Sequence, residues 1–154
     1  MTNQNRGVVE QVLDAAAQGD LGRFAELLEA HCARDLVVHE AGSLPYGGTH
    51  YGVSGFMTLL AEISGYIDAT SMVVEAIAGD GDNVVLRARS KWIAPPYDEA
   101  PLEIVVSEWW TFRDGKVVEV MPFYFDTAAL LDAKRRADSA NPTVGTGRTP
   151  TADQ

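Results

Sequence analysis

The chain has 154 residues, of which 46% are hydrophobic and 22% charged, so it is long enough for one domain with a substantial hydrophobic core. Its formal net charge of -10 disfavours phosphate backbones and anionic lipid, so we expect neither a nucleic acid nor a membrane as a partner. The single cysteine, Cys32, excludes an internal disulfide. No apolar run approaches the roughly 20 residues that span a bilayer, and the first residues lack the layout of a signal peptide. These features favour a cytoplasmic protein.

Helical patterns dominate the first part of the chain. Hydrophobic residues recur at a spacing of three and four in residues 8–18, 21–31 and 53–63, which predicts three amphipathic helices. Residues 35–40 are typical of a short strand between the second and third helices. The following segment, 41–52, is rich in residues that favour turns and is expected to be a loop.

The second part changes to a pattern typical of strands. Enrichment in β-branched residues predicts four strands, at residues 70–78, 83–93, 102–113 and 116–125. A short helix over 127–137 and a disordered tail over 138–154 should follow. We therefore expect one α+β domain over residues 1–137, in which three N-terminal helices pack on one face of a curved antiparallel sheet and leave a conical cavity.

Two segments of the chain resemble a known family. Leu36-Val-Val-His-Glu40 runs into Gly-Ser-Leu-Pro-Tyr-Gly-Gly-Thr, and Arg113-Asp-Gly-Lys-Val-Val-Glu-Val precedes Phe123-Tyr-Phe-Asp-Thr-Ala-Ala-Leu-Leu131. Over about residues 8–133 the chain resembles the SnoaL-like polyketide cyclases of the nuclear-transport-factor-2-like superfamily. The resemblance implies the cone-shaped fold of that superfamily and a homodimer. It constrains function less, because the superfamily contains isomerases, cyclases, hydrolases, dehydratases and non-catalytic binders.

The resemblance also implies a role for Asp126. In SnoaL-like cyclases an aspartate at the end of the last strand is the general acid/base of an aldol closure, and Asp126 stands at the matching position. The alternative is a helix cap, because Asp126 directly precedes the last predicted helix. Limonene epoxide hydrolases pair such an aspartate with an Arg-x-Asp, for which Arg87-Ala-Arg89 is the best match. The missing second aspartate weighs against epoxide opening, which would need a substitute such as Glu40 or Glu103.

The predicted hairpin at Asp114-Gly115 allows an assignment of faces. A two-residue loop would pair Trp109 with Val120 and Ser107 with Pro122. Alternation would then gather four pocket-lining side chains on one face: Ser107, Trp109, Tyr124 and Asp126. The opposite face is expected to form a dimer interface; it would carry Glu108, Trp110, Glu119, Met121, Phe123 and Phe125. A bulge at Pro122, which has no N–H to donate, would exchange the two faces.

Other side chains could complete a site. His39 could shuttle protons near neutral pH, and Tyr46, His50 and Tyr51 could line the rim of the cavity. Trp92 could stand at its mouth. For each of these residues the alternative is an ordinary packing or surface role. Zinc-ligand spacings, nucleotide-binding loops and a Gly-x-Ser-x-Gly motif are absent, so we expect neither a metal nor a cofactor.

These features predict a cofactor-free cyclase or isomerase. Asp126 would transfer a proton next to a carbonyl of a polyketide- or steroid-like ligand, and Tyr46, Tyr124 or His39 would stabilise the enolate oxygen. Asp126→Asn would then abolish turnover. The alternative is a non-catalytic small-molecule binder, or an accessory protein, of a biosynthetic pathway such as that of an antibiotic.

Overall fold

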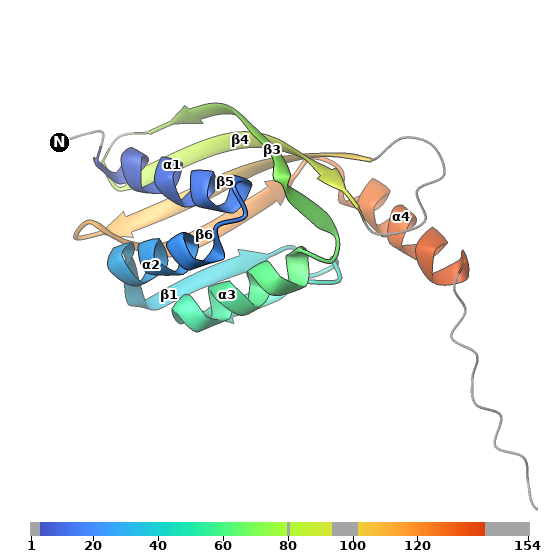
Figure 1. Ribbon diagram of the computed structural model, residues 1–154, viewed down its shortest axis with the longest axis horizontal. Helices are drawn as coiled ribbons and strands as arrows, with labels where there is room; N and C mark the ends of the chain where they lie inside the picture. The colour runs from blue at the N-terminus through green and yellow to red at the C-terminus, as the bar shows by residue number, and fades with distance from the viewer. Residues whose placement is uncertain (1–3, 80, 94–101, 141–154) are drawn as a thin grey trace, which may run out of the picture.

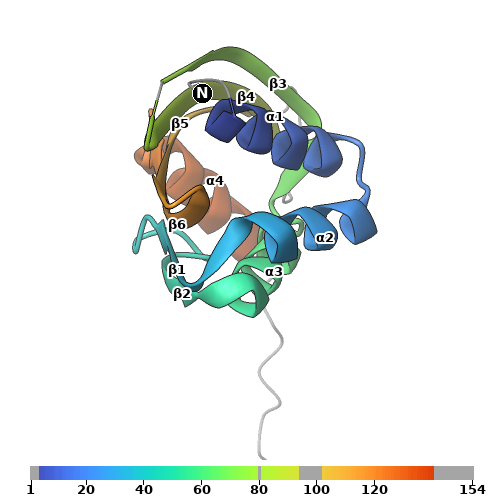
Figure 2. The same cartoon turned by 90° about the vertical axis from the view of Figure 1, so that its left-hand side faces the viewer.

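The computed structural model describes residues 4–79, 81–93 and 102–140 of the chain. Within these residues the helices are α1 (Gln4–Ala17), α2 (Leu21–His31), α3 (Gly52–Ile63) and α4 (Thr127–Ala140). The strands are β1 (Cys32–Glu40), β2 (Gly48–Tyr51), β3 (Ile67–Ala78), β4 (Asn83–Trp92), β5 (Glu103–Arg113) and β6 (Lys116–Tyr124). They form one sheet in the order β2-β1-β6-β5-β4-β3. The sheet curves around α1, α2 and α3 (Figure 2), and α4 lies beyond one end of it (Figure 1).

Alternation along the strands gives the sheet an inner and an outer face. In β4, Val84 and Leu86 point inward and are 1% and 2% exposed. Arg87 and Arg89 point outward, where both pair with Glu75 of β3. The first three helices turn their apolar sides to the inner face, as their three- and four-residue spacing requires. The hydrophobic core therefore lies between the concave face of the sheet and α1–α3.

This arrangement confirms the predicted α+β architecture, with two differences in the sheet. Strand β2 lies inside the segment expected to be a loop and pairs antiparallel with β1. Strand β1 pairs parallel with β6, so the sheet is mixed rather than wholly antiparallel. A four-residue strand that begins with glycine has little strand signal of its own, and it acquires its extended form by pairing with β1.

The hairpin between β5 and β6 forms at Asp114-Gly115, as predicted, with φ of 51° and 74° at these two residues. Positive φ at both positions is what a two-residue turn of type I′ requires. The predicted register, however, is wrong. Phe112 pairs with Val117 but Thr111 pairs with Glu119, so β6 carries one extra residue, Val118, as a bulge.

The bulge moves the pairing by one residue along β5. Trp109 lies opposite Met121 instead of Val120, and Ser107 lies opposite Phe123 instead of Pro122. Because successive side chains of a strand point to opposite faces, a shift of one residue exchanges the faces of β5 relative to β6. Glu108 now shares the inner face with Tyr124, and this single change decides which residues meet in the interior.

Two further expectations concern the ends of elements. Helix α4 continues to Ala140, so it includes the first three residues of the tail that was predicted to be disordered. The rest of that tail, 141–154, and the polar loop 94–101 lie outside the described residues. Among the helices that the structure describes, none is long and apolar enough to cross a membrane.

Candidate functional site

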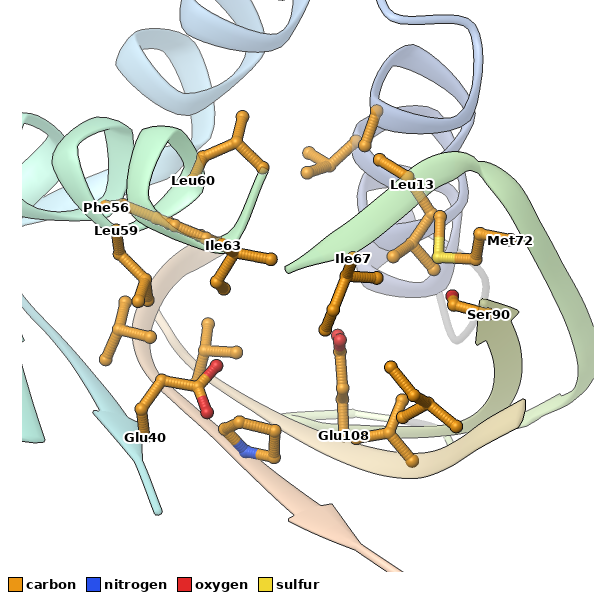
Figure 3. Close-up of a pocket in the computed structure, with 18 of the residues that line it drawn as sticks. Leu13, Glu40, Phe56, Leu59, Leu60, Ile63, Ile67, Met72, Ser90 and Glu108 are labelled. Atoms are coloured by element: carbon orange, nitrogen blue, oxygen red, sulfur yellow. The ribbon is translucent and has the colours of Figure 1, made fainter. Parts of the chain in front are cut away.

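A cavity of about 120 Å³ lies between the concave face of the sheet and helices α1 and α3 (Figure 3). Its wall is mainly apolar, with side chains such as Leu13 of α1, Leu60 and Ile63 of α3 and inward-facing residues of the strands. Of the described lining residues, four carry a carboxyl or hydroxyl group: Glu40, Ser90, Glu108 and Tyr124. Two acidic side chains in so apolar a cavity are unusual, because burial of a carboxylate is costly unless it is compensated.

Glu40 is the last residue of β1 and points into the cavity. Leu36 and Val38 of the same strand are 0% and 1% exposed, and the two-residue period carries Glu40 onto the same inner face. The hydroxyl of Tyr124 donates a hydrogen bond to Oε2 of Glu40 at 3.1 Å. Burial and the neighbouring Glu108 raise the pKa of Glu40 to about 8. Glu40 and Tyr124 also line an open pocket next to Thr127.

Glu108 occupies the middle of β5 on the same face as Val106 and Trp110. The indole Nε1 of Trp110 donates a hydrogen bond to its Oε2 at 2.9 Å. The apolar surroundings raise the pKa of Glu108, against the opposing effect of this indole bond. Figure 3 shows the carboxyl groups of Glu40 and Glu108 entering the cavity from two different strands.

The two carboxyl groups cannot both be ionised cheaply near neutral pH, because each is buried and each disfavours charge on the other. At least one therefore remains a neutral acid that can donate a hydrogen bond. Glu40, whose pKa of about 8 lies near neutrality, can exchange a proton with a bound molecule. The cavity thus combines a proton acceptor and a neutral proton donor in water-poor surroundings, which is the combination that proton transfer requires.

A group of aromatic rings supports the Glu40 side of the cavity. The ring of Tyr46 lies 5.7 Å from that of Tyr66 and 6.4 Å from that of Tyr124, and Trp92 lies 5.3 Å from Tyr66, measured between centroids. Burial, followed by the negative charge of Glu40, raises the pKa of Tyr124, so its phenol stays neutral and can donate to that carboxyl group.

Tyr46 and Trp92 belong to this packing and do not line the cavity, although both were predicted to contact a ligand. Each is 1% exposed. The hydroxyl of Tyr46 and the indole N–H of Trp92 are buried and have no hydrogen-bond partner among the described residues. Burial raises the pKa of the Tyr46 phenol. The observed positions match the packing alternative, in which these side chains hold Tyr124 and Tyr66 in place.

Asp126 lies outside the cavity, at the N-terminus of α4. Its side chain is exposed, and its Oδ1 accepts the backbone N–H of Ala129 at 3.0 Å. This is the hydrogen bond of a helix cap. The geometry therefore corresponds to the capping interpretation, and Asp126 is not among the residues that line the cavity.

The remaining predicted residues lie on β1 and β2, away from the interior cavity. His39 points to the face opposite Glu40, with its Nε2 3.4 Å from Oε2 of Glu119. Nε2 of His50 lies 3.4 Å from the backbone oxygen of Tyr46. Tyr51 is 70% exposed. None of these three lines the interior cavity; His39 and Tyr51 border a shallow groove on the outer surface.

Ser107 and Trp109 also lie away from the cavity, because the bulge at Val118 turns them to the outer face. Trp109 is 48% exposed there, beside Phe123, which is 53% exposed. Of the predicted catalytic and binding residues, the structure places only Tyr124 in the cavity. In the cavity Tyr124 lies together with Glu40 and Glu108. Glu40 was considered above only as a substitute carboxylate for epoxide opening, and Glu108 was predicted to lie on the opposite face of the sheet. The position of Glu40 could have been predicted from the sequence, because Glu40 follows the apolar residues Leu36 and Val38 at the two-residue spacing of one strand face.

A metal site is not evident in the part of the chain that the structure describes, where no three His, Cys, Asp or Glu side chains gather. Nor do the described walls of the cavity hold a lysine or arginine that would bind a phosphate. The mainly apolar wall, with its few carboxyl and hydroxyl groups, is suited to an uncharged organic molecule.

Comparison with known proteins places the chain among relatives of this architecture. The model of the SnoaL-like domain family matches residues 9–120. No curated protein matches the chain. Among solved structures, a nuclear-transport-factor-2-like protein of Burkholderia xenovorans is 23% identical, with a TM-score of 0.70 over 86% of this chain and 97% of that chain.

Two further structures carry names that refer to an activity. A protein of Jannaschia assigned as a SnoaL-like polyketide cyclase is 20% identical, with a TM-score of 0.68 over 86% of this chain and 92% of that chain. An epoxide hydrolase of Mycobacterium tuberculosis, of the limonene-epoxide-hydrolase-like type, is 20% identical, with a TM-score of 0.62 over 90% and 95%. At these identities the similarities concern the fold, and they confirm the predicted cone-shaped architecture.

Proposed function

The chain belongs to the SnoaL-like domain family, and from the paired carboxyl groups in its cavity we propose that it is a cofactor-free enzyme. It would transfer a proton next to the carbonyl group of a small apolar molecule, as a cyclase or isomerase does. The observation that supports this most directly is the placement of Glu40 and Glu108 in one apolar cavity, each with an aromatic hydrogen-bond donor of its own.

In the proposed reaction Glu40 is the base and Glu108 the acid. The Glu40 carboxylate takes a proton from the carbon next to the carbonyl, and the electron pair of that C–H bond moves to form the enolate. Neutral Glu108 donates a hydrogen bond to the enolate oxygen, where negative charge develops. In isomerisation the proton on Glu40 then returns to a different carbon of the conjugated enolate. In ring closure the enolate carbon forms a bond to the carbon of a second carbonyl of the same molecule, the π electron pair of that carbonyl moves to its oxygen, and the resulting alkoxide takes the proton from Glu40.

Tyr124 tunes the base in this scheme. Its hydrogen bond favours the charged form of Glu40 and so opposes the effect of burial on the pKa of that carboxyl group. Tyr124 is therefore a positioning residue. This replaces the predicted role of Asp126 with that of Glu40 and retains Tyr124 in the site.

The proposal is tested by proton exchange. Small ketones and 1,3-diketones are incubated with the protein in heavy water, and NMR follows the loss of the signal of the protons next to the carbonyl. Exchange above the rate in buffer supports the proposal. No acceleration for any member of the panel between pH 6 and 9 would contradict it, because proton removal is the step that isomerisation and aldol closure share.

Asp126 provides a further prediction. We expect Asp126→Ala to lower the free energy of unfolding by about 1 kcal/mol, and Asp126→Asn to lower it much less, because asparagine is also a good N-cap. Neither change should alter the rate of proton exchange. Urea denaturation and the exchange assay measure the two effects. A large loss of exchange in Asp126→Asn, with unchanged stability, would return the catalytic role to Asp126.

A non-catalytic binder remains the second candidate. The cavity is largely apolar, and with a pKa of about 8 the carboxyl group of Glu40 is mainly neutral at pH 7. Burial raises the pKa of Glu108 as well. Carboxyl groups that stay neutral could simply donate hydrogen bonds to a ligand. Ketone binding with no exchange at any pH would favour this function.

Epoxide opening is supported less well by the geometry. Glu40 does supply the substitute carboxylate that this chemistry would need, whereas Glu103 lies on the outer side and pairs with Arg89. Arg87 and Arg89, the best match to the Arg-x-Asp of epoxide hydrolases, both turn outward to Glu75. The described wall of the cavity thus lacks an arginine, and the arrangement favours carbonyl chemistry.

We also propose that two copies of the chain associate through the outer face of the sheet, in the cytoplasm as the sequence predicts. Trp109, Phe123 and Phe125 are 48%, 53% and 85% exposed, and aromatic side chains on one surface favour association. In light scattering after gel filtration we expect a dimer for the wild type and a monomer for Trp109→Glu. Leu21→Glu, which alters an exposed leucine on α2, is the control and should stay dimeric. A monomeric wild type, or a dimeric Trp109→Glu, would contradict this interface.

A further inference from the structure

A second chamber adjoins the cavity that holds the two carboxyl groups. It has a volume of about 420 Å³ and lies between the turn that joins α1 to α2, the C-terminal half of α3 and the beginning of β3. Four residues line both spaces: Ala16, Leu60, Ile67 and Ala69. The two spaces therefore share a wall, and we refer to them as the inner and the outer chamber. In Figure 3 the shared residue Ile67 points towards the carboxyl group of Glu108.

The volumes of the two chambers imply that a large ligand would place one part of the molecule in each chamber. A protein cavity of about 150 Å³ takes up benzene, so the inner chamber of about 120 Å³ holds a group slightly smaller than a six-membered ring. A polycyclic molecule of the predicted kind does not fit there as a whole. The outer chamber is more than three times as large and can accept the remainder.

The chemistry of the outer chamber selects an uncharged, apolar occupant. Leu21, Met57, Ala61 and Ile93 contribute apolar surface to its wall. The acidic residue there, Asp68, uses Oδ1 to accept the backbone N–H and the hydroxyl of Thr70 at 2.9 and 2.6 Å. No lysine or arginine is found among the described lining residues, and the whole chain carries a net charge of -10. An anionic tail would therefore be repelled.

We propose that the outer chamber binds the apolar body of the substrate while its small carbonyl-bearing end lies between Glu40 and Glu108. The preferred ligand is then an elongated, uncharged molecule with an unbranched, carbonyl-bearing end. This inference rests on the proposed function for the identity of the reacting end, but the binding of the apolar body is measured independently of any reaction.

The test uses a series of straight-chain 2-ketones from 2-butanone to 2-decanone, with affinity measured by NMR titration. The shortest members fit the inner chamber alone. For longer members we expect the affinity of the wild type to rise roughly fourfold for each added CH₂ that enters the outer chamber. Ala61 is exposed and lines only the outer chamber, so Ala61→Trp should remove this rise and leave 2-butanone unaffected. Ala128→Trp, on an exposed position of α4, is the matched control.

Each outcome decides the inference. Affinities that do not rise with chain length in the wild type would overturn it, as would a rise that Ala61→Trp preserves, or no binding of any ketone. Proton exchange is followed in the same samples. If affinity rises with chain length but no proton exchange is seen, the outcome supports ligand binding in the outer chamber and contradicts the proposed function. If exchange is seen but affinity does not depend on chain length, the outcome supports the proposed function and contradicts binding in the outer chamber.

Discussion

Replacement of Glu40 by glutamine is expected to lower the rate of proton exchange by roughly 100- to 10,000-fold, the usual contribution of a positioned general base. Glutamine has nearly the shape of a protonated glutamic acid, so it can keep a hydrogen bond with Tyr124, whose hydroxyl lies 3.1 Å from Oε2 in the wild type. It cannot accept a proton. The affinity for ketones should therefore change little, and the substitution should instead lower the rate constant of proton exchange within the protein–ketone complex.

The matched control is Glu62→Gln, which makes the same chemical change at an exposed position of α3 outside both chambers. It should keep the wild-type rate. In the wild type the rate should rise with pH up to about pH 8, because the pKa of Glu40 is about 8 and the carboxylate is the active form. A Glu40→Gln protein that exchanges protons as fast as the wild type would remove Glu40 from the mechanism.

The same substitution should make the protein more stable at alkaline pH. In the folded chain the pKa of Glu40 is about 8, against 4.5 for a free side chain. Between these values the folded state retains a proton that the unfolded state has released, so the free energy of unfolding falls as the pH rises from about 4.5 to about 8. Glu40→Gln abolishes this contribution. At pH 8.5 the variant should exceed the wild type by on the order of 3 kcal/mol, after allowance for the open pocket beside Glu40.

Urea denaturation of both proteins at pH 5 and pH 8.5 measures this effect. The two free energies of unfolding should lie within about 1 kcal/mol of each other at pH 5, which is close to the pKa of 4.5 of the free side chain, and should diverge at pH 8.5. Glu62→Gln should follow the wild type at both values. A constant difference between the wild type and Glu40→Gln would show that Glu40 is not buried in the manner described. Loss of activity with gain of stability would mark Glu40 as a residue retained for function.

Most elements of the fold could be predicted because their signals are local. The spacing of apolar residues in α1, α2 and α3 reflects the helical period. The enrichment of β3–β6 in β-branched residues is typical of strands, because these side chains pack well on a pleated sheet. The turn at Asp114-Gly115 depends on two residues that tolerate positive φ, and it formed as expected. Strand β2 was missed because its extended form depends on pairing with β1 rather than on its own residues.

The site was predicted less well, since its geometry depends on register and on distant contacts. One extra residue in β6, Val118, turns Ser107 and Trp109 outward and Glu108 inward. No local pattern marks the position of this bulge, because residues on both sides of it are equally suited to a strand. For Asp126 the helix-capping pattern was legible in the sequence, and the observed hydrogen bond to Ala129 agrees with it.

By itself, the sequence determined the α+β class, the helical and strand segments and a net charge of -10, because these depend on composition and short-range periodicity. The family followed from the resemblance of two segments of the chain to the SnoaL-like proteins. Only the tertiary structure decided which side chains share the cavity. Tyr124 meets Glu40 across 84 positions of the chain, and Glu108 joins them because a bulge and a curved sheet bring three strands to one space. The altered pKa values follow from that burial, which no local pattern of residues encodes.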